Sequence, residues 1–109
     1  MSDESAETPV LDLMGTMTAA SMEASGLDPQ TLMLVRIAAL VAVNAPPSSY
    51  LFNLGAAGEV GVDGERVRDV LAAVAPIVGT ARVASAVGNV VRALGFAELA
   101  AEQQLAEDA

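Results

Sequence analysis

The sequence lacks cysteine, histidine, tryptophan and lysine, and all five of its basic residues are arginines. Without cysteine the chain can form no disulfide and offers no thiolate for nucleophilic or redox chemistry. Without histidine it has no imidazole base and none of the usual zinc ligand sets, so we expect neither a metal nor a cofactor. Without lysine it cannot form a Schiff base. Carboxylates, hydroxyls, guanidinium groups, amides and the backbone remain for chemistry.

Positive charge is also scarce, and the net charge is −9. Four acidic residues lie in the first twelve positions and four in the last twelve, whereas the 85 residues between them hold six acids and five arginines. No basic stripe is present that could neutralise phosphates, so nucleic acid is not an expected partner. Acidic ends of this kind are typical of solubilising tails.

A chain of 109 residues has room for one hydrophobic core. Hydrophobic residues make up 53% and charged residues 17%, which is the reverse of the composition that keeps segments disordered. We therefore expect one helical domain over residues 8–98, a disordered acidic tail over 1–7 and an acidic C-terminal tail over 99–109.

Two uncharged or nearly uncharged stretches are long enough to span a bilayer. Residues 37–58 carry no charge, but Asn44, Pro46 and Pro47 would place costly polar and unpaired backbone groups at the centre of the span. Residues 70–91 are interrupted by proline, glycine and arginine. We expect no membrane span. The acidic, polar start also differs from a secretory signal, so we expect a cytoplasmic protein.

Capping residues and prolines mark the starts of helices, and glycine, asparagine or proline marks their ends. The start signals are Thr8-Pro9, Asp28-Pro29, Ala45-Pro46-Pro47, Asp63 and Thr80, and the stop signals are Gly26, Asn44, Gly61, Pro76 and Gly95. This order of signals predicts five helices. The stretch after the last stop could add a frayed turn or two, with Phe96, Leu99 and Leu105 docked on the body.

The predicted helix over 29–44 is apolar at every position from 32 to 43 except Arg36, so we expect it to be buried on all sides. In the last predicted helix, Ala84 and Gly88 would permit the close approach of another backbone. That helix carries one apolar stripe, formed by Val83, Val87, Val90, Val91 and Leu94. We also expect core-filling roles for Met14, Met17, Met22 and Met33.

No segment shows the two-residue alternation of a half-buried strand, so we predict an all-α protein, a single-domain bundle of five to six helices. So many apolar residues in so short a chain leave little polar surface to cover the core. We therefore expect a homo-oligomer in which the helix over 29–44 or its neighbours pack across a subunit interface.

Several motifs follow one another in a familiar order: Leu27-Asp28-Pro29, then Arg36-Ile37-Ala38-Ala39-Leu40-Val41-Ala42, a proline-containing break, a helix ending at Gly61, and an Asp63-capped helix leading to Pro-Ile-Val-Gly. Over about residues 27–95 this order resembles the carboxymuconolactone decarboxylase family, which includes the alkylhydroperoxidase D branch. Members of that family are all-helical and assemble as dimers, trimers or hexamers. The resemblance thus implies a helical oligomer.

The sequence departs from that family at the positions that carry its peroxidase chemistry. Peroxidase-type relatives have Cys-x-x-Cys-x-x-x-His at the start of the third helix and a glutamate further upstream. Anchoring on Gly61 places Pro46, Ser49, Asn53 and Leu34 at the four positions. None of the four chemical groups is retained. We expect no thiol peroxidase activity, because a hydroxyl cannot form or exchange a disulfide.

Ser48, Ser49 and Tyr50 fall in the first turn of a predicted helix, where free backbone N–H groups and the positive end of the helix dipole favour a carboxylate or phosphate. Asn53 lies one turn later on the same face and can form hydrogen bonds but cannot take a proton at neutral pH. The alternative is that the serines only cap the helix and that Tyr50 packs with its hydroxyl at the surface. Asn44 is more simply interpreted as a cap of the preceding helix.

Arg36 is the only charge in its predicted helix. A buried guanidinium needs a partner, which would be a carboxylate, a helix C-terminus or a ligand anion. An ion pair within the chain and a ligand-binding role both remain open. The acidic residues available for the ion pair are Glu59, Asp63 and Asp69.

Three functions remain open. The first is a family member without thiol peroxidase activity that binds a small anionic or carbonyl-bearing molecule near Arg36, Ser48, Ser49, Tyr50 and Asn53. The second is a cofactor-free decarboxylase or lactone-processing enzyme with Tyr50 or a carboxylate as the acid. The third is a structural assembly module that forms oligomers and recruits a partner through its acidic ends.

Overall fold

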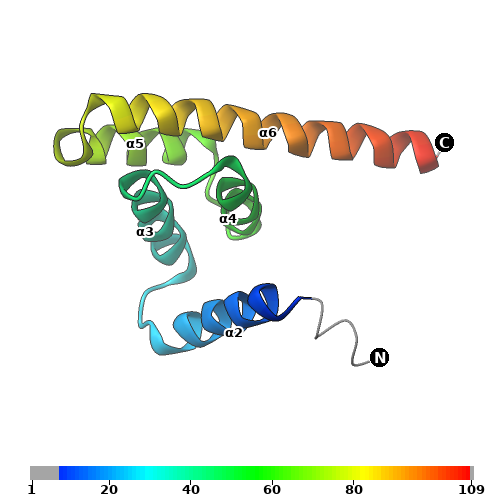
Figure 1. Cartoon of the computed structure of the whole chain (residues 1–109), viewed down its shortest axis with the longest axis horizontal. Coiled ribbons are helices and arrows are strands. Elements are labelled where there is room, and N and C mark those ends of the chain that lie inside the picture. The colour runs from blue at the N-terminus through cyan, green and yellow to red at the C-terminus, as the bar shows by residue number, and fades with distance from the viewer. Residues whose placement is uncertain (1–7, 109) are drawn as a thin grey trace.

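The computed structural model of the chain describes residues 8–108, and of residues 96–101 and 107–108 it describes the backbone alone. The described part consists of helices and their connections, with no strand, which confirms the all-α prediction. Figure 1 shows the five helices in chain order: α2 (Pro9–Ala24), α3 (Pro29–Ala42), α4 (Pro47–Glu59), α5 (Gly64–Val78) and α6 (Thr80–Asp108).

Four of these helices form one body, and the remaining helix stands apart from it. The helices α5 and α6 run side by side as a hairpin, and α3 and α4 pack beneath this hairpin (Figure 1). In the same view α2 lies below the free ends of α3 and α4. None of the described helices is both long enough and apolar enough to cross a membrane.

Two aspartates start helices as the sequence predicts. The Asp28 carboxylate accepts a hydrogen bond from the backbone N–H of Thr31 at 3.1 Å and another from the Thr31 hydroxyl at 2.6 Å. The Asp63 carboxylate accepts a hydrogen bond from the backbone N–H of Arg66 at 3.0 Å. Each carboxylate therefore satisfies N–H groups that have no partner within the helix.

Two helices end in the same backbone motif, one at Asn44 and one at Gly61. Both residues have positive φ, 54° at Asn44 and 89° at Gly61. After α3 the N–H of Ala45 donates to the carbonyl of Leu40, and after α4 the N–H of Val62 donates to the carbonyl of Ala57. This is the Schellman arrangement, which satisfies the last helical carbonyls. The predictions for Asn44 and Gly61 are confirmed.

Other predicted boundaries are wrong. Pro76 lies inside α5, which continues to Val78, and Gly79 with φ 89° ends that helix. Gly95 lies inside α6, a single helix of 29 residues that runs to Asp108. The stop at Gly26, by contrast, is confirmed in position, because α2 ends at Ala24 with Ser25 as its C-cap and Gly26 directly after it, although Gly26 does not adopt a positive φ. The predicted tail over 1–7 lies outside the described residues, and the domain bounds remain a prediction.

The core consists of two adjoining clusters, and α3 contributes to both. The first cluster contains Val41, Ala45, Tyr50, Leu71, Ala86 and Ala93, and the second contains Met33, Ile37, Ala57, Val62 and Val67. The expectation that α3 is buried on all sides is nevertheless wrong. Val35 is 51% exposed and Val43 is 70% exposed, because α3 packs through only part of its circumference.

The apolar stripe predicted for α6 does not face the core. Val87, Val91 and Leu94 are exposed, whereas the small residues Ala86 and Ala93 face the core. A Cβ atom added at Gly88 would meet nothing within 4 Å, so no backbone approaches this position closely. Leu105 is exposed and does not dock, and the side chains of Phe96 and Leu99 lie outside the described residues.

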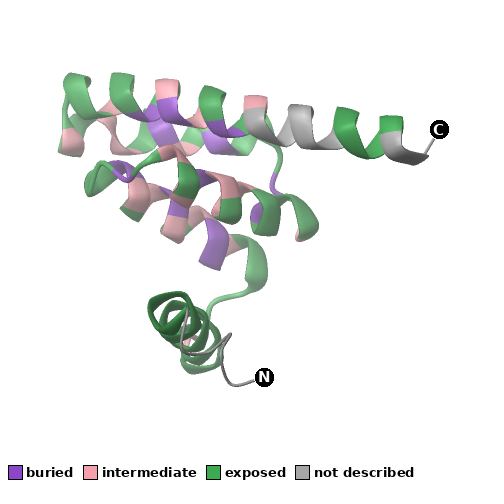
Figure 2. Ribbon diagram, turned by 45° about the vertical axis from the view of Figure 1, so that its right-hand side comes forward, coloured by how far each residue is buried: buried purple, intermediate pink, exposed green. Residues whose placement is uncertain are grey.

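α2 buries none of its residues, as the exposed colour along its length in Figure 2 shows. Met14, Met17 and Met22 were expected in the core but are exposed on this helix. Met33 on α3 is buried as expected. The difference arises because α3 lies between other helices, whereas α2 has no described helix packed along it.

Candidate functional site

Arg36 is the first of the predicted site residues, and it connects α3 to α2. Its Nη2 atom donates a hydrogen bond to the Ser21 hydroxyl at 3.1 Å and a longer one to the Thr18 carbonyl at 3.4 Å. The expected pairing with Glu59, Asp63 or Asp69 is not found. The ion pair that the described residues contain joins Arg68 to Glu65 at 3.9 Å. Arg36 thus binds neutral oxygens on another helix rather than a carboxylate.

The two serines lie in the first turn of α4. Ser48 is exposed and Ser49 is half-buried. The N–H of Ser49 already donates to the carbonyl of Pro46 at 3.1 Å. No side chain caps this helix, so the prediction that the serines act as caps is wrong. The backbone bond removes one of the donors that an anion would need at this helix start.

Tyr50 lies in the core, not at the surface. It has no exposed area and packs in the first core cluster with Val41, Ala45 and Leu71. Its hydroxyl is buried and has no hydrogen-bond partner among the described residues. Burial raises the pKa of the Tyr50 phenol above its ordinary value, because the charged phenolate would lose its hydration. The hydroxyl therefore stays protonated and is an unused donor.

Asn53 uses its amide within its own helix. The Nδ2 atom donates to the carbonyl of Ser49 at 2.8 Å, one turn earlier. This bond holds the side chain against α4. A short polar side chain in a helix often forms such a local bond with the backbone.

The structure does not bring the five predicted residues together. Arg36 is bound to α2, whereas Tyr50 packs among residues of α3, α5 and α6. Two adjoining hollows beside α4 and α6 each hold about 180 Å³ and share Leu54 and Leu94, but none of the five residues lines them. In the described part of the chain no group of acidic side chains is placed to hold a metal ion.

A polar seam that the sequence analysis missed lies between α6 and the end of α3. We use this name for Arg82, Ser85, Asn89 and Arg92. The Asn89 amide donates to the carbonyl of Ala45 at 3.0 Å, and the Ser85 hydroxyl donates to the Asn44 side chain at 2.9 Å. Arg82 donates to the carbonyl of Ala42, and Arg92 donates to the Asn89 amide oxygen at 3.4 Å.

The polar seam has a structural role. Its residues recur at intervals of three or four and thus share one face of α6, which is the signal that could have revealed them. Two of their partners are backbone carbonyls at or just past the end of α3, where intrahelical donors are missing. The seam therefore fixes α6 across the end of α3. It offers no free reactive group.

The fold and its polar groups define a class of protein: a small all-helical bundle with neither thiol nor imidazole at the start of α4. The sequence model of the Carboxymuconolactone decarboxylase family matches residues 9–102, and the chain belongs to this family. The match is wider than the stretch 27–95 on which the resemblance rests, because it includes α2 and more of α6. No curated protein and no solved structure matches the chain.

Proposed function

We propose that the chain is a self-assembling subunit of the carboxymuconolactone decarboxylase family that lacks thiol peroxidase activity. The observation that carries the proposal is α2, a helix of 16 residues with no buried residue. The match to the family model begins at residue 9 and so includes this helix, which makes α2 part of the family's domain and not an appended tail.

The absence of peroxidase activity rests on the chemistry of four positions. Leu34, Pro46, Ser49 and Asn53 occupy the places of the peroxidase groups. Ser49 supplies a hydroxyl, and the Asn53 amide is bonded to the Ser49 carbonyl. Neither group can form a disulfide, and the amide cannot take a proton at neutral pH. A change of conformation would not supply a thiol or an imidazole, since the chain contains neither cysteine nor histidine.

Self-assembly is supported by the amount of apolar surface that the single chain leaves exposed. On α2 six large apolar residues are between 52% and 67% exposed: Val10, Leu11, Leu13, Met14, Met17 and Met22. Contiguous apolar patches on soluble proteins are usually covered by a partner or mark a binding site. Closed assemblies of identical subunits are the commonest way to cover them.

Two measurements on the purified chain test this function. Light scattering coupled to size-exclusion chromatography is expected to give a mass of at least two chains at micromolar concentration. A hydroperoxide-reduction assay with a dithiol reductant is expected to give no turnover above buffer. A compact monomer throughout the concentration range would overturn self-assembly, and turnover that follows the protein through purification would overturn the loss of peroxidase activity.

A second candidate function is the binding of a small carbonyl-bearing molecule, and the Tyr50 hydroxyl favours it. A buried hydroxyl without a partner loses its hydration without compensation, and a ligand oxygen would restore a hydrogen bond. The same protonated hydroxyl is the candidate acid of a cofactor-free decarboxylase or lactone-processing enzyme. An anionic ligand has less support, because Arg36 is bound to α2 and lies away from Tyr50.

A thermal-shift screen with lactones and dicarboxylates tests the second candidate. A ligand that prefers the native state raises the melting temperature. The rise is expected for wild type and should vanish in Tyr50→Phe, which keeps the ring and removes the hydroxyl. An equal rise in both proteins, or no rise with any compound, would exclude Tyr50 as the binding group.

A further inference from the structure

We infer that α2 is the element through which two copies of this chain pair, with Arg36 holding the helix in position. This inference rests on the proposed self-assembly and assigns the surface that performs it. The pairing surface, here called the α2 face, consists of Val10, Leu13, Met14 and Met17 together with Ala20 and Ala24.

The α2 face follows from helical geometry. At 100° per residue these side chains fall on one side of α2, while Asp12, Thr16, Ala19 and Glu23 fall on the other. Leu11 and Met22 lie at the border. The helix is therefore amphipathic, and its apolar side, which also holds Ser21, buries no residue against the described helices. Most of the stability of a helix in a protein comes from packing of its apolar side. An amphipathic helix whose apolar side stays in water therefore lacks its main source of stability.

The area of this surface fits a dimer contact. Together with Leu11 and Met22 at its border, the large apolar side chains of the α2 face expose on the order of 600 Å², which approaches the roughly 800 Å² that each partner contributes to a standard interface. Phe52 on α4 and Ile77 on α5 are single exposed residues, whereas Val87, Val91 and Leu94 form a shorter exposed stripe on α6, at 45% to 62%. The α2 face is thus the larger of these two exposed stripes, with four large apolar side chains against three on α6.

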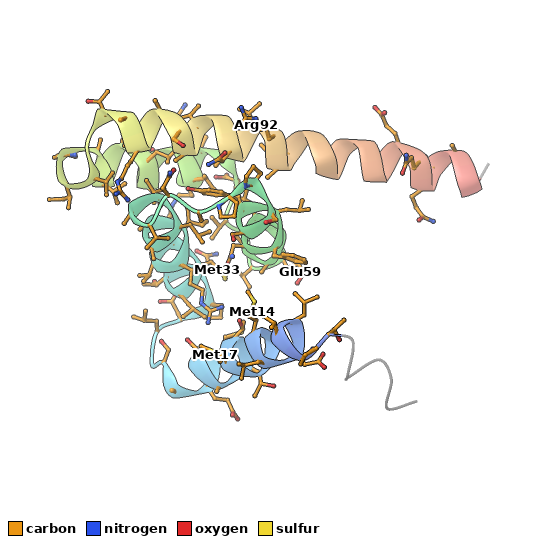
Figure 3. The ribbon with its side chains drawn as sticks, viewed as in Figure 1. Met14, Met17, Met33, Glu59 and Arg92 are labelled. Carbon is orange, nitrogen blue, oxygen red and sulfur yellow. The ribbon has the colours of Figure 1, made fainter. Side chains whose placement is uncertain are left out.

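Arg36 fixes where α2 stands. Its bond to Ser21 reaches α2 within the α2 face, because Ser21 falls between Val10 and Met14 around the helix, and its bond to Thr18 reaches the border. Toward the start of the helix, Val10, Leu13, Met14 and Met17 stay more than half exposed. In Figure 3 Met14 and Met17 lie on α2, and Met33 and Glu59 lie at the near ends of α3 and α4. Because α2 buries nothing against the body, this arginine is the described polar connection that orients it. We assign Arg36 as a positioning residue for the interface.

A second copy fits this surface better than a membrane does. α2 carries Asp12 and Glu23 and no basic residue, so an anionic lipid surface would repel it. A pair of identical α2 faces needs no complementary charges, because a two-fold axis sets the same apolar patch against itself. The flexible side chains of Met14 and Met17 can adapt to each other in such a contact.

The test compares sedimentation velocity of the full chain over a range of concentrations for three proteins. Wild type is expected to associate reversibly. Met17→Asp should raise the midpoint concentration by at least about tenfold, because it places a charge in the contact. Ile77→Asp is the matched control, since Ile77 is 86% exposed on α5, and it should associate like wild type.

The outcomes separate this inference from the proposed function. A monomeric wild type would overturn both. An oligomeric wild type with an equally oligomeric Met17→Asp variant would overturn the assignment to α2 and leave self-assembly intact. Co-flotation of a monomeric wild type with phosphatidylcholine–phosphatidylserine vesicles, lost in Met17→Asp, would overturn pairing in favour of a lipid surface.

A cross-linking experiment gives an independent readout. The chain has no native cysteine, so Met17→Cys and Ile77→Cys each introduce a single thiol. A short bismaleimide should join two chains of the Met17→Cys variant and not of the Ile77→Cys variant.

The positioning role of Arg36 has a test of its own. Arg36→Ala is expected to weaken association several-fold without lowering the unfolding midpoint of the dilute chain, and Arg36→Lys should restore part of the association. If Arg36→Ala lowers the unfolding midpoint but leaves association unchanged, Arg36 does not position the interface.

Discussion

The body formed by α3 to α6 and the helix α2 are made of similar residues but have opposite surroundings. α3 buries Leu32, Met33, Ile37 and Val41, whereas α2 exposes every residue along its length. Both helices begin with a proline in the first turn and are rich in leucine, methionine and alanine. The comparison teaches that local signals specify where a helix begins, and that burial depends on whether another element faces it.

The largest expected effect is on the free energy of unfolding, which should fall much more for a substitution in the body than for one on α2. Ile37→Ala should destabilise the chain by about 3 kcal/mol, because it opens a cavity in the second core cluster. Met17→Ala on α2 should cost less than about 0.5 kcal/mol at concentrations where the chain is monomeric. Urea unfolding followed by far-ultraviolet circular dichroism measures both. Equal losses would mean that α2 is packed against the body in solution.

A smaller effect is expected at the start of α5. Asp63→Ala should lower the free energy of unfolding by about 1 kcal/mol, since it removes the hydrogen bond to the Arg66 N–H. Asp69→Ala, an exposed position on the same helix, is the control and should change little. If the two variants unfold alike, the cap contributes nothing and the boundary of α5 depends on packing alone.

Tyr50→Phe is expected to be neutral or to stabilise the body by up to about 1 kcal/mol. The substitution removes a buried hydroxyl that has no partner among the described residues and keeps the ring in the core. Thermal unfolding without added ligand is the measurement. A clear loss of stability would show that the hydroxyl is bonded in solution without ligand, which would remove the observation that favours the second candidate function.

The smallest expected effect is a pH dependence at the connection between the two regions. The hydroxyl and the N–H of Thr31 donate to Asp28 and hold the pKa of its carboxyl below the ordinary value. The folded pKa is therefore below the unfolded one, so the ionised group stabilises the native state near neutrality, and this stabilisation is lost as the pH falls through the acidic range. Asp28→Asn should flatten that part of the stability profile. An identical profile for both proteins would contradict this assignment.

The helix starts could be predicted because they depend on few residues close in sequence. Asp28, Asp63 and the Pro46-Pro47 pair act through bonds or φ restrictions within one turn. Gly61 and Asn44 end their helices as predicted, and both have positive φ. The prediction that Gly95 ends a helix is wrong, because a glycine ends a helix only when it adopts a left-handed conformation. The residues from Ala97 to Ala106 are strong helix formers, and α6 continues through them.

The arrangement of the candidate site could not be predicted from the sequence. Its residues are spread over two helices, and their directions depend on which helix faces each one. Arg36 donates a hydrogen bond to Ser21 on α2, which lies 15 residues away in sequence. No spacing rule links two residues at this separation. Tyr50 was expected either in a ligand site or packed with its hydroxyl at the surface, yet the packing of α6 against α4 encloses the whole side chain.

The enclosure of Tyr50 gives the chain a built-in optical reporter. It is the sole tyrosine of a sequence without tryptophan, so ultraviolet absorbance near the phenol band and intrinsic emission arise from this one ring, apart from the weaker phenylalanines. An alkaline titration should show phenolate formation only when the four-helix body opens. The same spectra are blind to α2, so their comparison with backbone dichroism distinguishes melting of that helix from melting of the rest.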